Sequence, residues 1–389
     1  MFADRIPGDL SPNRLALAVR QRRASGKPII DLTESNPTRV GLEYPAYLLA
    51  PLADRRALLY SPEPLGLLDA RRAVAADYAR RGISISPEQI ALTASTSEAY
   101  SVLFKLLARP GDEVLVPRPS YPLFEMLTQL DNVVARPYDL EYHGSWIIDF
   151  TSVERALSPR TRALLLVNPN NPTGSFASGR EIELIAEIGA HYGIPLIVDE
   201  VFADYVLEPG TTPVRPAFPS RSDALVFALG GLSKSIGLPQ AKLAWIAAAG
   251  PSQLVAESLE RLELICDTYL SVSTPVQLAA AELIERGAAI RAQISDRTRT
   301  NYRRLKDAGA SVPSCEVLTA CGGWNAVIRV PTLCSEEELM LTLLTTDGVL
   351  AHPGYFFDFP RESFVIVSLL VTEAAFAAGI ERLFARFVD

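Results

Sequence analysis

The sequence is poor in lysine, histidine and cysteine. Only five of its 37 basic residues are lysines, so arginine carries most of the positive charge. The three histidines are scattered, and the four cysteines lie far apart with no C-x-x-C pair. This spacing argues against a metal centre or a disulfide framework, and it favours reduced thiols and a cytoplasmic protein.

Long apolar runs and excess positive charge are also missing. No uncharged apolar run reaches the roughly 18 residues that cross a bilayer. The start, MFADRIPGDLSPNRL, has no basic segment followed by an apolar core, so we expect no secretory signal. The net charge of −8 disfavours a surface for phosphate backbones. We therefore expect neither a membrane nor a nucleic acid as a partner.

The 389 residues, 48% of them hydrophobic and 21% charged, are typical of a globular protein with two or three domains. Seven short runs that are apolar on both faces predict strands of a mostly parallel sheet covered by helices. These runs are EQIALT (88–93), DEVLVP (112–117), NVVARP (132–137), RALLLVN (162–168), PLIVDE (195–200), ALVFAL (224–229) and LAWIAA (243–248). The stretch is predicted to be an α/β domain.

Helical periodicity appears before, between and after these strands. Residues 13–24 and 65–82 predict helices, the second ending at Gly82. After residue 275 a long helical pattern covers 275–309, and strands then mix with helices to the end of the chain. This change predicts a second, smaller α+β domain.

One of the five lysines, Lys234, lies in the nearly uncharged loop GGLSKSIGLPQAK between two predicted strands. At a strand end facing a cleft, a desolvated lysine has a lowered pKa and becomes a nucleophile toward aldehydes. A solvated loop lysine is the alternative. Asp199 ends the run PLIVDE, where a buried carboxylate needs a cation unless it caps the next helix.

Three further segments follow predicted strands. NPNNPTG (168–174) forces an extended turn that fixes an amide side chain. TASTSEA (93–99) opens a helix, where hydroxyl and backbone N–H groups either bind an anion or simply cap the helix. PSYP (119–122) puts Tyr121 where it could stack on a flat ring.

Taken in order, six segments resemble the class I and II aminotransferases, a family of fold-type I pyridoxal-phosphate enzymes. They are YSPEPLG, TASTSEA, PSYP, NPNNPTG, DEVFADY and SKSIGLPQAK. The resemblance covers nearly the whole chain. It implies a large α/β domain with a seven-stranded sheet at 46–275, and a small α+β domain formed by 276–389 together with an N-terminal arm, 1–45.

The resemblance also implies the roles of the residues around the ring of pyridoxal 5'-phosphate. Lys234 is expected to form an imine (aldimine) with the cofactor and then to move a proton as the catalytic residue. Asp199 is expected to keep the pyridine nitrogen protonated, so that the ring accepts electrons. Asn171 corresponds to the residue that binds the ring hydroxyl, and Tyr121 to the aromatic that stacks on the ring.

The cofactor phosphate is expected at Ser95, Thr96 and Ser97, with Lys242 as its cation. Tyr60 corresponds to a tyrosine that reaches the phosphate of the neighbouring subunit, which implies a homodimer with shared sites. Lys242 itself is a departure, because the family usually has an arginine there, whose fork binds phosphate in two places. Phe202 replaces a usual tyrosine and removes a donor to the ring hydroxyl.

The third departure concerns the substrate. The strand SFVIVSLLV has Ile366 where the family usually has an arginine for the substrate carboxylate. We take Arg329, on the run NAVIRV, and Asn36 as candidate substrate-binding residues. Arg361 and Arg39 could take the place of Arg329, and a substrate without this contact is a further possibility.

These features predict a pyridoxal-phosphate aminotransferase that moves an amino group from an amino acid to a 2-keto acid in two stages (ping-pong). Because the usual arginine is absent, a second hypothesis keeps the cofactor but changes the reaction to that of a lyase, racemase, decarboxylase or oxidase. A third hypothesis is a non-catalytic effector-binding protein. It is disfavoured, because the acidic chain offers no DNA-binding segment in its first 45 residues.

Overall fold

The structure is a computed structural model that describes every residue except 1–2, 4, 209–217, 219–222, 362 and 389. Within these residues the largest sheet has eight strands, in the order β2-β9-β8-β7-β6-β3-β4-β5. The strands are β2 (Ile90–Thr93), β3 (Glu113–Arg118), β4 (Val134–Tyr142), β5 (Trp146–Ile148), β6 (Thr161–Val167), β7 (Leu196–Asp199), β8 (Val226–Gly231) and β9 (Ala244–Ala249).

The predicted mostly parallel sheet is confirmed, with one strand more than expected. All seven predicted strands are present, and the eighth, β5, forms an antiparallel hairpin with the end of β4. Its three residues are too few to show a pattern in the sequence. β3, β4, β6, β7 and β8 are mutually parallel, whereas β9 runs antiparallel between β2 and β8. The carboxyl ends of the parallel strands therefore meet at one edge of the sheet.

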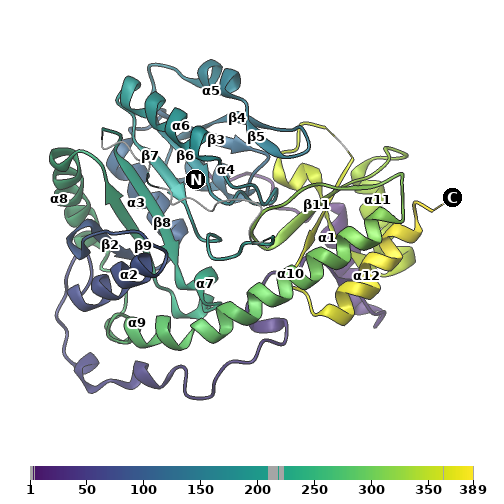
Figure 1. The fold of residues 1–389 in the computed structure, drawn as a ribbon, viewed down its shortest axis with the longest axis horizontal. Coiled ribbons are helices and arrows are strands. Elements are labelled where there is room, and N and C mark those ends of the chain that lie inside the picture. The colour runs from purple at the N-terminus through teal and green to yellow at the C-terminus, as the bar shows by residue number, and fades with distance from the viewer. Residues whose placement is uncertain (1–2, 4, 209–217, 219–222, 362, 389) are drawn as a thin grey trace.

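Helices cover both faces of this sheet (Figure 1). The α-helices in the described part of the chain are α1 (Arg14–Ala24), α2 (Leu68–Arg80), α3 (Thr96–Leu107), α4 (Leu123–Leu130), α5 (Phe150–Ala156), α6 (Gly179–Tyr192), α7 (Leu232–Ser235), α8 (Ser252–Tyr269), α9 (Thr274–Arg286), α10 (Ala288–Ala310), α11 (Glu336–Thr342) and α12 (Glu373–Ala385). Buried side chains of α2, α6 and α9 share one core, and those of α3, α4 and α8 share another.

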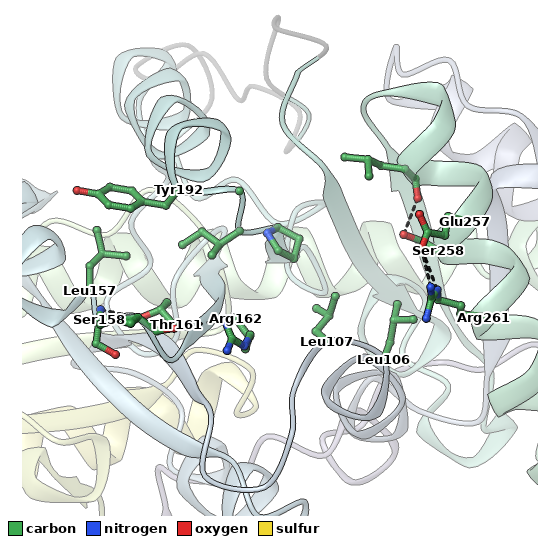
Figure 2. Close-up of a pocket in the computed structure, with 15 residues that line it drawn as sticks. Leu106, Leu107, Leu157, Ser158, Thr161, Arg162, Tyr192, Glu257, Ser258 and Arg261 are labelled. Atoms are coloured by element: carbon green, nitrogen blue, oxygen red, sulfur yellow. Dashed lines mark hydrogen bonds and ion pairs between the residues drawn. The ribbon is translucent and has the colours of Figure 1, made fainter.

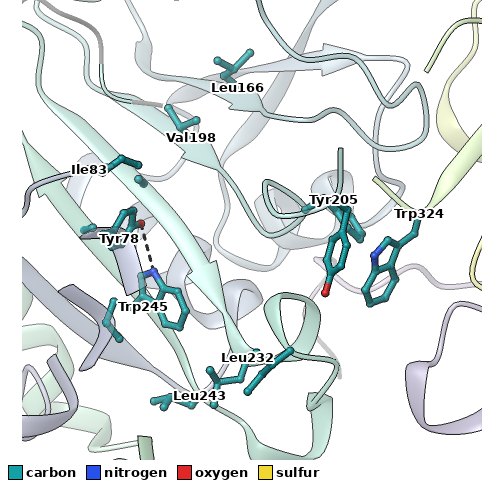
Figure 3. Close-up of a cluster of buried hydrophobic side chains, with 14 of the residues drawn as sticks. Tyr78, Ile83, Leu166, Val198, Tyr205, Leu232, Leu243, Trp245 and Trp324 are labelled. Carbon is teal, nitrogen blue, oxygen red and sulfur yellow. Dashed lines mark hydrogen bonds between the residues drawn. The ribbon is translucent and has the colours of Figure 1, made fainter. Parts of the chain in front are cut away.

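Alternating residues of one strand supply these two cores. Leu196 and Val198 of β7 face the first core, while Ile197 faces the second. Because successive side chains of a strand point to opposite faces, a strand between two helical layers must be apolar throughout. Figure 3 shows part of the first core, where the Trp245 indole donates a hydrogen bond of 3.3 Å to the Tyr78 hydroxyl.

The predicted helical stretch 275–309 is two helices, α9 and α10, which meet at Gly287. A Cβ atom added at Gly287 would lie 2.6 Å from Cβ of Ile236. The close approach of these two segments therefore requires glycine at the junction. Helical periodicity continues through such a break, so the pattern alone does not reveal it.

The C-terminal part contains an antiparallel sheet in the order β10-β11-β14-β13. Near it, β1 pairs with β12 in parallel, which brings the N-terminal segment onto the C-terminal part. These strands are β1 (Ile30–Asp31), β10 (Glu316–Val317), β11 (Asn325–Arg329), β12 (Val349–Leu350), β13 (His352–Pro353) and β14 (Phe364–Ser368). The domain limits at residues 45 and 275 stay a prediction. Among the described residues, none of the helices combines the length and apolarity that a bilayer crossing needs.

Candidate active site

A cavity of about 310 Å³ opens at the carboxyl-end edge of the large sheet. Segments that follow β2, β3, β6, β7 and β8 line it, and β11 of the C-terminal sheet closes one side. Eight of the eleven residues predicted to bind cofactor or substrate line this cavity, and they are Ser95, Thr96, Ser97, Tyr121, Asn171, Asp199, Lys234 and Lys242. Parallel strand ends thus bring together segments that are far apart in the chain.

Lys234 lies on α7, a single helical turn that follows directly on β8. Its amine Nζ is 4.9 Å from the centre of the Trp324 ring and 5.7 Å from that of Phe202. Burial lowers the pKa of Lys234, and the charge of Asp199 partly opposes this effect. The Tyr205 hydroxyl donates to the Lys234 carbonyl, which holds the turn in place. The result is a fixed amine that loses its proton more easily than an ordinary lysine.

The lowered pKa predicts a measurable reactivity of Lys234. In the cofactor-free protein, acetic anhydride should label Lys234 with a pH midpoint below the ordinary value of 10.5, because the neutral amine is the reacting form. Labelling at each pH is followed by peptide mass spectrometry. In an Asp199→Asn variant the midpoint should fall further, since the opposing charge is gone. A midpoint at or above 10.5 in the wild type contradicts this description of the site.

Asp199 is the last residue of β7 and is 7% exposed. Its Oδ1 accepts the Val201 backbone N–H at 3.0 Å, and its Oδ2 accepts the Tyr100 hydroxyl at 2.7 Å. Burial raises the pKa of Asp199, and these two hydrogen bonds counteract the shift. An ionised carboxylate here is costly unless a cation joins it in the cavity.

The three asparagines of NPNNPTG have different tasks. Asn168 accepts the Ala177 N–H, and Asn170 donates to the Pro119 carbonyl, so both hold the turn together. Only Asn171 lines the cavity, where its Oδ1 accepts the Asn325 amide at 2.7 Å. The turn therefore presents one amide to the cavity, as predicted for this segment.

The other end of the cavity has features of an anion site. Ser95 is the N-cap of α3 and accepts the Glu98 N–H, so Thr96 and Ser97 form the first turn. Backbone N–H groups in a first turn have no partner within the helix and attract anions. Lys242 lines the same cavity with a φ of +52°, a left-handed conformation that is uncommon outside glycine.

Three predicted residues do not line this cavity. Tyr60 is 75% exposed and lies in a separate hollow beside Cys266 and Ser271. Arg329 pairs with Glu316 on the neighbouring strand β10, and its side chain is 52% exposed. Asn36 instead caps a short turn by accepting the Thr38 N–H at 3.0 Å. Their positions in this chain therefore do not support direct roles for Arg329 and Asn36 in the cavity.

Arg39 and Arg361, which could have taken the place of Arg329, are exposed and do not line the cavity either. Ile366 is fully buried in the core, in register with Val327 of β11. Among the described residues that line the cavity, Lys234 and Lys242 alone carry positive charge. A substrate carboxylate would therefore meet no arginine from the described lining of this chain.

Several lining residues were not predicted from the sequence. Tyr100, Trp324 and Asn325 each touch a predicted residue from another element. Trp324 directly precedes the run NAVIRV and Asn325 begins it, at the entry to a strand, but the sequence does not indicate which sheet edge they face. Tyr100 lies within an amphipathic helix, where a tyrosine gives no signal of function.

A second, more open hollow of about 450 Å³ lies at the opposite edge of the sheet (Figure 2). It borders the amino ends of β6 and β7, and its charged side chains pair at the surface, as Arg261 does with Glu257 at 2.6 Å. None of the predicted site residues lines it. The chemistry predicted from the sequence thus belongs to the smaller cavity.

Comparison with known proteins decides the family. Residues 27–383 match the family described as aminotransferase class I and II. The chain belongs to this family. Members of the family use pyridoxal phosphate, and the resemblance noted in the sequence is confirmed.

The chain covers different shares of the length of its relatives in the family. The alanine aminotransferase of Mycobacterium tuberculosis is 26% identical over 380 residues, 92% of this chain and 86% of that protein. Nicotianamine aminotransferase 1 of Oryza sativa subsp. japonica is 34% identical over 215 residues, 55% of this chain. This match spans only 42% of the rice protein.

Solved structures of the family share the fold. An aminotransferase from Escherichia coli superposes with a TM-score of 0.86 at 21% identity, covering 100% of this chain and 98% of that one. The alanine aminotransferase from Pyrococcus furiosus gives a TM-score of 0.85 at 22% identity, covering 96% and 95%. The fold-type I architecture is therefore the architecture of this chain.

Proposed function

We propose that this protein is a pyridoxal-phosphate-dependent aminotransferase that transfers an amino group from an amino acid to a 2-keto acid. The observation that carries the proposal is a partly buried amine, Lys234, in one cavity with a buried carboxylate, Asp199. The N-terminal first turn of α3 lines the same cavity. Family membership supports the same activity.

The cavity suits pyridoxal phosphate in charge and in shape. The desolvated Lys234 amine fits an aldehyde, and the carboxylate of Asp199 fits a protonated ring nitrogen. The first turn of α3 and Lys242 fit a phosphate group. Tyr121 has room to lie against a flat ring, since it is 42% exposed and lines the cavity.

Bound pyridoxal phosphate supplies an aldehyde and an electron-withdrawing ring, the chemistry by which amino groups are transferred. With the group bound, Lys234 Nζ would take a proton from the α-carbon of the substrate and return it to the carbon of the cofactor's former aldehyde group. Asp199 holds a proton on the ring nitrogen. Asn171 is left with Nδ2 as its donor toward the ring hydroxyl, because Asn325 occupies its Oδ1.

The reaction is tested on the purified holoprotein in two separate stages. An amino acid alone should yield its keto acid in an amount equal to the protein, with loss of the visible absorption. Adding a different keto acid should then restore the absorption and release the matching amino acid. Release of ammonia, carbon dioxide or peroxide without this exchange would favour the second hypothesis, another pyridoxal-phosphate reaction. The cavity lining supports keeping that hypothesis, since none of its described residues is an arginine.

We further propose a homodimer in which Tyr60 completes the site of the partner subunit. Leu58, Leu59 and Tyr60 are 85%, 71% and 75% exposed. Three consecutive large apolar side chains at the surface are typical of a protein–protein contact. For its compartment, the spacing of the cysteines keeps the cytoplasm as our proposal.

Mixed dimers test this arrangement. Chains with Lys234→Ala and chains with Tyr60→Ala should each be weakly active alone. Mixing equal amounts through unfolding and refolding should restore about a quarter of the wild-type activity. About half of the dimers are then hybrids, and each hybrid has one complete site out of two. Dimers that form without any restored activity would refute the shared site, and a monomer in light scattering would refute the dimer.

A further inference from the structure

Tyr100 links the two ends of the candidate active site. It lies on α3, whose first turn forms the predicted phosphate end, and its hydroxyl is 2.7 Å from Asp199 Oδ2 at the other end. Tyr100 is 3% exposed, yet it lines the cavity. The same helix therefore forms the proposed phosphate site with its first turn and contacts Asp199, the proposed partner of the ring nitrogen, through Tyr100.

The hydrogen bond from Tyr100 limits how Asp199 can point. An ionised carboxylate offers about four acceptor positions on its two oxygens. Val201 occupies one on Oδ1 and Tyr100 occupies one on Oδ2, so the carboxylate plane is held from two sides. The remaining positions are available to a donor in the cavity. The charges of Glu200 and Lys234 also act on Asp199, Glu200 raising its pKa and Lys234 lowering it.

The Tyr100 ring is itself held firmly. Its centre lies 5.3 Å from that of Phe124, edge to face, and 6.1 Å from that of Phe104. Burial and the nearby Asp199 raise the pKa of the Tyr100 hydroxyl well above its usual value. The hydroxyl therefore stays a neutral donor over the whole working pH range, and the ring cannot turn away without losing these aromatic contacts.

We propose that Tyr100 is a positioning residue that keeps Asp199 ionised and aimed at the ring nitrogen of pyridoxal phosphate. The inference rests on the proposed function, since it concerns the same cofactor. A hydrogen bond to an ionised carboxylate stabilises the charged form. Without it, Asp199 competes for the proton that the ring nitrogen should carry. Because Tyr100 is on α3, the helix that is proposed to hold the phosphate also sets the position of Asp199.

The test compares Tyr100→Phe with a matched control, Tyr138→Phe. Tyr138 is also fully buried and donates to the Leu165 carbonyl at 2.9 Å, but it does not line the cavity. Two quantities are measured besides activity. They are the dissociation constant of pyridoxal phosphate from the protein, and the pH midpoint of the visible absorption of the holoprotein.

For Tyr100→Phe we expect about 10-fold weaker cofactor binding, the size of a lost hydrogen bond to a charged group. The pH midpoint should rise. A ring nitrogen with less positive charge withdraws fewer electrons, so the imine nitrogen between Lys234 and the cofactor keeps its proton up to a higher pH. Tyr138→Phe should change neither quantity. In an Asp199→Asn background, Tyr100→Phe should shift the midpoint no further, since the two residues act as a unit.

The outcomes separate this inference from the proposed function. If the wild type binds the cofactor and transaminates while Tyr100→Phe keeps both quantities unchanged, Tyr100 is structural only and the inference is wrong. Equal shifts in the wild-type and Asp199→Asn backgrounds would overturn it as well. A wild type that binds no pyridoxal phosphate would overturn the proposed function, and this inference with it.

Discussion

Replacing Lys234 with alanine is expected to reduce transamination by at least about 10⁴-fold, the upper range for a residue that acts in proton transfer. The loss is this large because one amine supplies both the link to the cofactor and the proton shuttle. Pyridoxal phosphate should still bind weakly through its phosphate. The half-reaction rates and the absorption spectrum of the variant measure the two losses separately.

The matched control is Lys27→Ala, which removes an exposed lysine. It should keep the wild-type rate and spectrum. The melting temperature of Lys234→Ala should not fall below that of the cofactor-free wild type, because the desolvated Lys234 amine is costly to keep charged. Retained turnover in Lys234→Ala would remove the basis of the proposed function.

The second large effect is expected for Asp199→Asn, with a loss of about 10²–10³-fold in the half-reaction, a range typical of losing one preorganised electrostatic contact. The amide has nearly the same shape as the carboxylate but no negative charge. Its one oxygen can still accept the Val201 N–H, and its amide nitrogen then faces the Tyr100 hydroxyl, which can accept from it. The amide cannot, however, keep a proton on the ring nitrogen. Rapid-mixing measurements with an amino acid donor follow this change.

Stability distinguishes this effect from misfolding. The pKa of Asp199 is raised by burial, so near neutral pH the cofactor-free fold has to keep a disfavoured charge. Asp199→Asn should therefore melt at the same or a higher temperature than the cofactor-free wild type. As the pH falls toward the raised pKa, wild-type Asp199 gains its proton and the difference should shrink. A variant that is both fully active and equally stable would mean that the charge of Asp199 is not used.

Much of the fold could be predicted from the sequence, because its signals are local. The run PLIVDE predicted β7 and placed Asp199 at its end, where the structure has it. The break between α9 and α10 could not be predicted. It depends on the approach of Ile236 to Gly287, which are 51 positions apart in the numbering.

The same division applies to the site. Lys234, Asp199 and Asn171 follow strand-like runs, and parallel strands bring their carboxyl ends to one edge, so their meeting could be predicted. Tyr100 and Asn325 could not, since their partners are 99 and 154 positions away. Arg329 was proposed as a substitute cation on the run NAVIRV, and that run forms β11, whose first residue Asn325 lines the cavity. That strand, however, turns the side chain toward Glu316 and not toward the cavity.

By itself, the sequence determined which elements form and which reactive side chains end them, because apolar periodicity and turn residues act over a few neighbouring positions. Only the tertiary structure decided which hydroxyl reaches Asp199, which amide orients Asn171, and that Tyr60 faces outward. Those contacts depend on how the layers pack around the sheet. Packing joins residues whose distance along the chain leaves no trace in the local pattern.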